Sequence, residues 1–432
     1  MSRDPETRGL ASSPPDAGRR GSLTIGHVLF LASASVASFE ILLFKSFTAY
    51  DLLTALLFVL VLARGRIPIP PAGVLASGLV FLLFALLSTL RAPHPDQSLT
   101  QILQYLFILF IQLPVILAFA RSSFMIHASL VAFTLGTLFG FADVYLSPQQ
   151  VWDERVGASF SESPNRLGYP TAYVIPFVCY AAVRLWGKRR ARLPVLVGGV
   201  AVAYLMLWAL AASGSRGAAA GTIVGLAVFL SFRRGFSLRL AGLARVAAAL
   251  LVMALCGTLL YRSPYFPQTL GERIERTMAA EPNLVQDRTR LAIAGWRAFE
   301  ESPLLGVGLD NFRYVADRYI PTITQQLPHN LWIQLLAHTG IFGALGFLGM
   351  LVSWFGIMLR RQHLEGAGAE RELIWAFIAS MSAIMTIFLF LPVLIQRQYW
   401  LVFGLGLSAA LGRELARREG MGSSRKTEVL GS

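Results

Sequence analysis

Long apolar runs recur along most of the chain, and they constrain its fold more than any other feature of the sequence. A helix that crosses a bilayer needs about 20 apolar residues, and by that length the sequence predicts about twelve spanning helices. We expect these near 24–43, 49–63, 72–90, 100–120, 124–146, 166–186, 193–212, 217–232, 240–261, 330–359, 372–395 and 398–412. Only 14% of the residues are charged, against about a quarter in soluble domains. The sequence therefore predicts an all-α polytopic membrane protein.

Positive charges gather in every second connection between these runs, and the intervening connections are neutral or acidic, as at Asp153, Glu154 and Glu162. Lysine and arginine are retained on the cytoplasmic side of membrane proteins. The alternation holds through all the predicted spans and places both termini in the cytoplasm. The formal charge of +14 is explained by these loops, so no nucleic-acid partner is expected. The basic residues are Arg64, Arg66, Arg121, Lys188, Arg189, Arg190, Arg192, Arg233, Arg234, Arg239, Arg245, Arg360, Arg361, Arg413, Arg417 and Arg418.

The long polar stretch 261–329 then lies outside the cytoplasm, which is the periplasm in a bacterium with an inner membrane. The predicted organisation is a disordered cytoplasmic tail at 1–22, nine helices within 23–260, the periplasmic loop at 261–329, three helices within 330–412, and a cytoplasmic tail at 413–432. Residues 1–22 have no apolar core, so no cleaved signal peptide is expected. Cys179 and Cys256 lie inside apolar runs, which argues against a disulfide or a zinc site.

The stretch 261–329 is expected to fold as a small helical cap, because a structureless loop of this length is unusual. Helices are predicted at 270–280 and 285–301, and Pro303 ends the second because the residue before a proline avoids helical dihedrals. Gly306 and Gly308 predict a flexible turn. A third short helix is expected at 310–320, with Phe312, Val315 and Tyr319 facing inward.

His329 lies next to the first residues of the predicted helix at 330–359. The positive end of the helix dipole and nearby arginines both disfavour the imidazolium, so a neutral ring is expected. A neutral imidazole can act as a general base near pH 7. The local sequence equally allows a histidine that caps the helix or binds headgroups. His338, about 13 Å further along at 1.5 Å per residue, is interpreted mainly as a packing histidine, although ionisable groups inside membranes tend to be functional.

Arg216 follows Ser213, Gly214 and Ser215 at the external start of a span. A planar guanidinium suits phosphate oxygens, although an interfacial arginine can also simply extend its head into water. Arg288 is a second candidate for phosphate binding, with a solvated surface charge as its alternative. Arg290 competes for the same role, and Arg397 is a further candidate in a short external loop.

Asn165 lies at the external start of another predicted helix. There it either caps the helix or hydrogen-bonds a sugar or phosphate. A glycine at every third position, from Gly340 to Gly349, indicates close helix packing. The sequence has no phosphate loop for ATP. It also has no paired carboxylates on the external side, so neither a metal site nor another cofactor is expected.

Taken together, these motifs resemble those of the O-antigen ligase family of bacterial inner-membrane glycosyltransferases, which is related to the O-antigen polymerases. The specific motifs lie between Asn165 and Gly343, and their order on one predicted side of the membrane carries the resemblance. They are His329-Asn330 followed by Gly340-Ile341-Phe342-Gly343, Arg288 upstream of Pro303-Leu304-Leu305-Gly306-Val307-Gly308 and Asn311-Phe312, Ser215-Arg216-Gly217, and Pro164-Asn165-Arg166-Leu167-Gly168.

The resemblance implies a GT-C-like glycosyltransferase that moves a glycan from undecaprenyl pyrophosphate onto lipid A–core in the periplasm, without nucleotide, metal or other cofactor. Arg216 and Arg288 would bind the pyrophosphate, and His329 would take the proton of the attacking hydroxyl in one inverting displacement. Membrane lipids are its further partners. The additional candidate site residues are Asn165, Asn330, Arg290, His338 and Arg397.

Three alternatives stay open. An O-antigen polymerase would use the same donor, but such enzymes tend to have two sizeable external loops, whereas 147–164 is short. A protein O-glycosyltransferase would usually add an external C-terminal part. A flippase for lipid-linked oligosaccharides should place ionisable or helix-breaking residues near mid-membrane in paired halves, and the sequence shows no such repeat.

Overall fold

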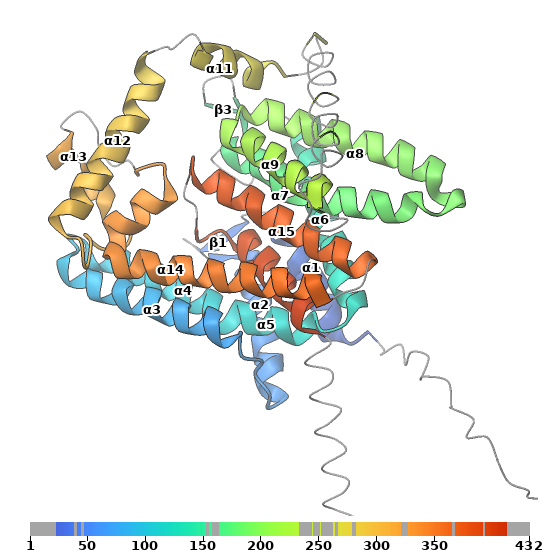
Figure 1. The fold of residues 1–432 in the computed structure, drawn as a ribbon, viewed down its shortest axis with the longest axis horizontal. Helices are drawn as coiled ribbons and strands as arrows, with labels where there is room; N and C mark the ends of the chain where they lie inside the picture. Colours follow the sequence, from blue (N-terminus) through green and yellow to red (C-terminus); the bar gives the residue numbers. More distant parts are fainter. Residues whose placement is uncertain are drawn as a thin grey trace, which may run out of the picture.

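The computed structural model describes residues 23–38, 41–44, 47–147, 149–152, 155–157, 164–232, 244, 251, 262–263, 267–278, 282–320, 327–364, 368–391 and 394–412. Within these residues the protein is mostly helical (Figure 1). A last helix covers 397–412. The earlier α-helices are α1 Ile25–Val36, α2 Ala49–Ala63, α3 Ala72–Ser88, α4 Pro95–Phe107, α5 Leu113–Phe119, α6 Ser123–Leu146, α7 Pro164–Trp186, α8 Arg192–Ser213, α9 Arg216–Phe232, α11 Thr269–Met278, α12 Pro282–Glu301, α13 Ala316–Tyr319, α14 Leu331–Leu364 and α15 Ala369–Phe388.

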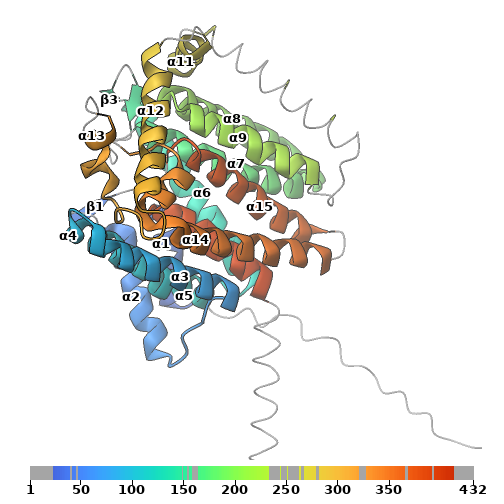
Figure 2. The same ribbon diagram turned by 60° about the vertical axis from the view of Figure 1, so that its left-hand side comes forward.

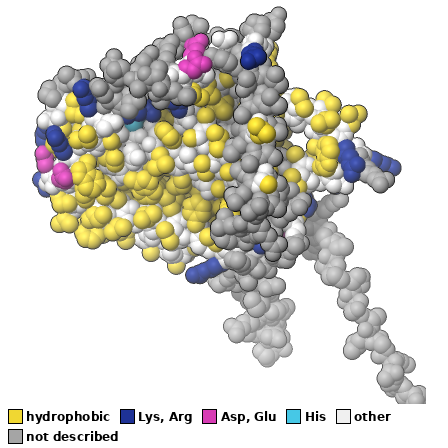
Figure 3. Space-filling view, turned by 45° about the horizontal axis from the view of Figure 1, so that its top comes forward, with side chains coloured by type: hydrophobic (Ala, Val, Ile, Leu, Met, Phe, Trp, Pro, Cys, Tyr) yellow, Lys and Arg dark blue, Asp and Glu magenta, His cyan; other side chains and the backbone are white. Residues whose placement is uncertain are grey.

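Six stretches of described helix are long and apolar enough to cross a membrane: Ala72–Arg91, Pro95–Phe119, Ser123–Leu146, Arg192–Ser213, Leu331–Gln362 and Ala369–Phe388. Every predicted span contains a described helix except 240–261, which apart from residues 244 and 251 lies outside the described residues, as do both predicted tails. Figure 3 shows a broad hydrophobic face with Lys and Arg side chains toward its ends. These observations confirm a helical membrane protein.

The described residues also include short strands, which leave the predicted all-α architecture unchanged. Two antiparallel hairpins occur in the connections, β1 Leu42–Phe44 with β2 Phe47–Thr48, and β3 Gln149–Trp152 with β4 Arg155–Gly157. Both are short turns of chain between helices, and neither belongs to a larger sheet.

Helices α3 and α14 pack closely through the predicted glycine series. A Cβ at Gly346 would lie 2.6 Å from the Phe81 backbone nitrogen, and one at Gly349 would lie 2.7 Å from the Ser77 hydroxyl. The glycines therefore let the two backbones approach, as expected. Gly340 differs from the others, because its φ of 65° interrupts the helix and forms a kink.

The segment 303–308 is fixed against this kink. The Val307 N–H donates to the Ala337 carbonyl (2.8 Å), and the Ile341 N–H donates to the Pro303 carbonyl (2.8 Å). Gly308 adds a further bond from its N–H to the His338 carbonyl (3.0 Å). The kink exposes backbone groups of α14, and the turn satisfies them. The turn predicted at the two glycines is present, and these hydrogen bonds hold it against α14.

Replacing Gly306 with alanine is expected to destabilise the protein by about 1–3 kcal/mol, because φ here is positive. The new Cβ would also lie 2.5 Å from the Ala337 carbonyl oxygen, with φ at +69°. Thermal unfolding in detergent measures the effect. Gly198→Ala on α8 is the matched control, because nothing lies within 4 Å of its Cβ position. Equal stability of the Gly306→Ala and Gly198→Ala variants would contradict backbone strain at position 306.

The predicted cap is present as helices, but it packs in two parts. Helix α12 buries Leu291, Ala294 and Ala298 in a cluster with Phe312 and with Ala337 of α14. Helix α11 instead contacts α8 and α9. The expected helix at 310–320 is broken into a 3₁₀ turn, Phe312–Tyr314, and the short α13. Figures 1 and 2 show α12 and α13 together beside the beginning of α14.

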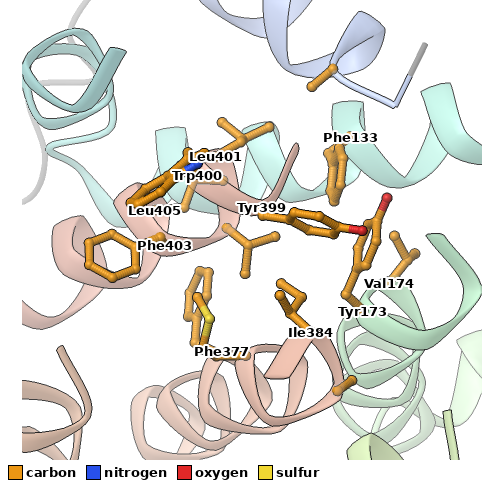
Figure 4. Close-up of a cluster of buried hydrophobic side chains, with 14 of the residues drawn as sticks. Phe133, Tyr173, Val174, Phe377, Ile384, Tyr399, Trp400, Leu401, Phe403 and Leu405 are labelled. Atoms are coloured by element: carbon orange, nitrogen blue, oxygen red, sulfur yellow. The ribbon is translucent and has the colours of Figure 1, made fainter. Parts of the chain in front are cut away.

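An aromatic core holds α7 against the last helix (Figure 4). The Tyr173 ring stacks on Phe133 at 6.0 Å between centroids and meets Tyr399 edge-on at 5.5 Å. Phe177 and Phe377 make a second edge-on pair at 5.0 Å, between α7 and α15. Such contacts fix the position of α7, which carries Asn165 to the candidate site.

Candidate active site

One pocket joins several of the predicted site residues. Its volume is about 370 Å³, which includes space open to solvent. It is formed by the beginning of α7, the junction of α8 and α9, both parts of the cap, the residues before α14 and the chain after α15. Its lining residues are Asn165, Tyr169, Gly214, Ser215, Arg216, Gly217, Arg273, Arg288, His329, Phe390 and Leu391. The structure therefore brings together Arg216, Arg288, His329 and Asn165, which are far apart in sequence.

The pocket lies where helices begin or end. Helices α7, α9 and α14 begin beside it, and α15 ends beside it. Successive spans of a bundle run in opposite directions, so this set of ends belongs to one side of the bundle. That is the arrangement that the alternation of charges predicts for the long polar stretch.

The sequence around Arg216 explains how that side chain enters the pocket. Gly214 ends α8 with a φ of 58°, and the Ser215 hydroxyl accepts from the Ala218 N–H (3.3 Å), at the first turn of α9. Arg216 is therefore the first residue of α9. Gly217 allows the chain to approach Phe390, since a Cβ would lie 2.9 Å from its side chain. The positive end of α9 adds to the attraction for an anion.

His329 is held in an unusual backbone conformation at the mouth of α14. Its φ is 53°, in the left-handed region that non-glycine residues seldom adopt. The next residue supplies the cap, because the Asn330 side-chain oxygen accepts from the N–H groups of Trp332 (3.0 Å) and Ile333 (3.3 Å). The interpretation of His329 as the cap of this helix is therefore excluded.

The His329 ring is half-buried, and its Nδ1 has no hydrogen-bond partner among the described residues. Burial, with the Arg288 charge adding to it, lowers its pKa from 6.5 to about 4. The imidazole is therefore neutral at pH 7, as the sequence predicted. A half-buried, neutral ring that lines a pocket is available to accept a proton.

Arg216, Arg273 and Arg288 form a cationic wall of the pocket. Their positive charges repel one another. Arg288 and Arg273 both act electrostatically on Arg216, and Arg273 acts on Arg288. Burial, with Arg273 adding to it, lowers the pKa of Arg288. No carboxylate is found among the described residues that line the pocket. Guanidinium groups gathered in this way favour a ligand with several phosphate oxygens.

The other candidates lie elsewhere. Arg290 is exposed on α12, and Asn330 caps α14. His338 is buried within the bundle, where its Nδ1 accepts from the Asp310 N–H (3.3 Å), in agreement with a packing role. None of these three lines the pocket.

Arg397 is bound to a carboxylate on α2 rather than to the pocket. Its Nε donates to Asp51 Oδ1 (2.6 Å) and its Nη2 donates to Asp51 Oδ2 (3.2 Å). The Gln112 side chain donates to the Arg397 carbonyl (3.0 Å), from the π-helical turn Ile108–Gln112. Arg397 therefore connects the last helix to α2.

Arg273 is a charged pocket residue that the sequence did not predict. It lies in a predicted helix of the loop, but that helix also carries Arg276, and no local signal separates the two. Tyr169, Phe390 and Leu391 were missed because apolar and aromatic residues at helix ends are ordinary in membrane proteins. The described residues contain no group of three or more His, Cys, Asp or Glu side chains that could hold a metal ion.

Replacing Arg288 with glutamine is expected to raise the pKa of His329 from about 4 toward 6.5, because a neighbouring positive charge is removed. The shift is partial, since burial is the larger cause. An NMR titration of labelled histidines measures it, with His329→Ala used for assignment. Arg290→Gln, exposed on the same helix, is the control. An unchanged or lower pKa of His329 in the Arg288→Gln variant would contradict the electrostatic effect of Arg288 on that ring.

Comparison with known families finds that the O-antigen ligase family model matches residues 201–348. The matched segment contains Arg216, Arg273, Arg288 and His329 of the pocket. A comparison with curated proteins finds no match. The match supports the resemblance that the sequence motifs carry, and it supports an enzyme of the broad O-antigen ligase and polymerase superfamily. Residues 201–348 of the chain are therefore similar to the O-antigen ligase family.

Proposed function

We propose that the protein transfers a glycan from undecaprenyl pyrophosphate to a sugar hydroxyl of lipid A–core. The observation that carries this proposal is the pocket in which a neutral histidine and three arginines meet. An anionic diphosphate and a hydroxyl that must lose a proton are the two substrates such a pocket suits. The family match at 201–348 supports the same chemistry at a coarser level.

In the proposed reaction, the acceptor oxygen attacks the anomeric carbon of the glycan, and the bond from that carbon to the phosphate oxygen breaks. The electron pair of that bond leaves with the diphosphate, where Arg216 and Arg288 stabilise the growing charge. The hydroxyl proton passes to His329. One displacement of this kind inverts the anomeric configuration. The products are the ligated glycan and undecaprenyl pyrophosphate.

The low pKa of His329 fits this role once the donor is bound. A pKa of about 4 keeps the free ring neutral, but a ring with so low a pKa is a weak base. A bound diphosphate places negative charge beside the ring and raises its pKa toward neutrality. The arginines provide the charge that stabilises the leaving group, so the proposed reaction proceeds without a metal ion.

The proposal includes a membrane arrangement. The chain would cross a bacterial inner membrane with about twelve helices in a GT-C-like architecture, with cytoplasmic termini and the pocket on the periplasmic side. The clustering of helix ends around the pocket supports a site at one side of the membrane, and the alternation of charges supports the periplasmic side. Asn165, at the beginning of α7, would bind a sugar or phosphate at the pocket edge.

The test uses the purified full-length protein in lipid nanodiscs, with a glycan on undecaprenyl pyrophosphate, in EDTA and with or without lipid A–core. We expect ligated product only when lipid A–core is present. Product formed from the donor alone would identify an O-antigen polymerase instead. Donor translocation in vesicles without release of undecaprenyl pyrophosphate would identify a flippase. Loss of turnover in EDTA that a divalent ion restores would contradict a metal-free reaction.

A further inference from the structure

The three arginines of the pocket come from differently packed parts of the protein. Arg288 lies on α12, which packs on α14, the helix that begins just after His329. Arg273 lies on α11, which contacts α8 and α9. Arg216 is the first residue of α9. The pocket therefore has one side near α14 with His329 and Arg288, and another side near α9 with Arg216 and Arg273.

The electrostatic contacts follow the same order. Among the described arginines, Arg288 is the one whose charge acts on the His329 ring. Arg288 and Arg273 both act on Arg216, Arg288 the more strongly, and Arg273 also acts on Arg288. Arg288 is thus the arginine whose charge reaches the His329 ring, whereas the charge of Arg273 reaches Arg288 and Arg216.

A glycan donor held here has a fixed order of groups. If His329 takes the acceptor proton, the anomeric carbon must lie beside that ring. The phosphate attached to the sugar is then close to Arg288. In a diphosphate donor, the second phosphate lies further from His329, on the side of Arg216 and Arg273. A monophosphate donor has no group to place there.

We propose that Arg273 is a specificity-determining residue that binds the phosphate farther from the sugar, so that the pocket selects diphosphate-linked over monophosphate-linked glycans. The inference rests on the proposed function, because it assumes that His329 marks the reacting end of the donor. It adds a selectivity that the sequence motifs around Arg216 and Arg288 do not specify. A guanidinium can contact two oxygens of the distal phosphate at once.

The test measures direct binding of two donors to the full-length protein in detergent, without acceptor, so that no transfer takes place. One donor carries a glycan on undecaprenyl pyrophosphate, and the other carries the same glycan on undecaprenyl monophosphate. We expect Arg273→Gln to weaken diphosphate binding by about 10- to 100-fold, as for loss of a charged hydrogen bond. Monophosphate binding should change by less than about fivefold, the range for a distant or exposed charge.

Two controls sharpen the result. Arg288→Gln should weaken both donors, because both place a phosphate beside that residue. Arg290→Gln, exposed on α12 outside the pocket, should weaken neither. Melting curves of each variant establish that the fold is retained.

Equal weakening of the two donors by Arg273→Gln would overturn the inference, and so would unchanged binding of the diphosphate donor. Wild-type protein that binds both donors with equal affinity would also overturn it. The binding assay does not depend on turnover. Failure of the ligation assay together with the expected binding pattern would therefore refute the proposed reaction and leave the selectivity in place.

Discussion

Replacing His329 with alanine is expected to lower kcat for glycan transfer by about 10²–10⁴-fold, the range for loss of a general base. The neutral ring lines the pocket, and its Nδ1 has no hydrogen-bond partner among the described residues. Removal of the imidazole leaves the arginines in place, so donor binding should change little. Turnover is measured with reconstituted protein at saturating donor and lipid A–core, and donor affinity is measured separately without acceptor.

The neighbouring residue gives a matched control for this prediction. Asn330→Ala removes the cap of α14 and should cost about 0.5–2 kcal/mol of stability, with a much smaller loss of kcat than His329→Ala. The two variants thus separate chemistry from helix capping. Full turnover in His329→Ala would exclude the proton-transfer role. A parallel loss of donor affinity and turnover in a folded His329→Ala protein would instead assign the ring to substrate binding.

Replacing Asp51 with alanine is expected to destabilise the protein by about 3–5 kcal/mol, because it leaves a buried guanidinium without its carboxylate. The Arg397 side chain is about 10% exposed and that of Asp51 about 1%. Asp51 also accepts from the Thr48 N–H (3.0 Å) at the beginning of α2. Thermal unfolding in detergent measures the loss, and Arg397→Ala should show a similar effect for the opposite charge.

The double replacement of Asp51 and Arg397 by leucine distinguishes a structural pair from a substrate-binding arginine. The double variant has neither the carboxylate nor the guanidinium, so no buried charge is left unpaired. It should therefore be more stable than either single alanine variant. Its folded fraction should retain turnover, because Arg397 does not line the pocket. A double variant that folds but has lost donor affinity would restore Arg397 as a substrate-binding residue.

Much of the helical layout could be predicted from the sequence. The run at 49–63 is helix α2 without change, and the run at 124–146 is α6 less one residue. Such agreement arises because the length of an apolar run sets the length of a spanning helix. The same reasoning overestimated the first span, where α1 ends at Val36 and the hairpin β1–β2 follows.

Features that depend on distant partners could not be predicted in this way. Arg397 looked like a pocket arginine because its partner Asp51 lies 346 residues earlier in the chain. The turn at Gly306 looked flexible because its hydrogen bonds are made to α14. Arg273 has no distinctive neighbours in sequence, and only the packing of α11 on α8 and α9 brings it to the pocket.

The most direct measurement is a single-turnover transfer with enzyme in excess over the glycan donor and with lipid A–core present. The ligated glycan and the released undecaprenyl pyrophosphate are quantified together, and the anomeric configuration of the new bond is determined by NMR. We expect equal amounts of the two products and an inverted configuration. A retained configuration, or a lipid product carrying one phosphate, would contradict direct displacement of the diphosphate in this pocket.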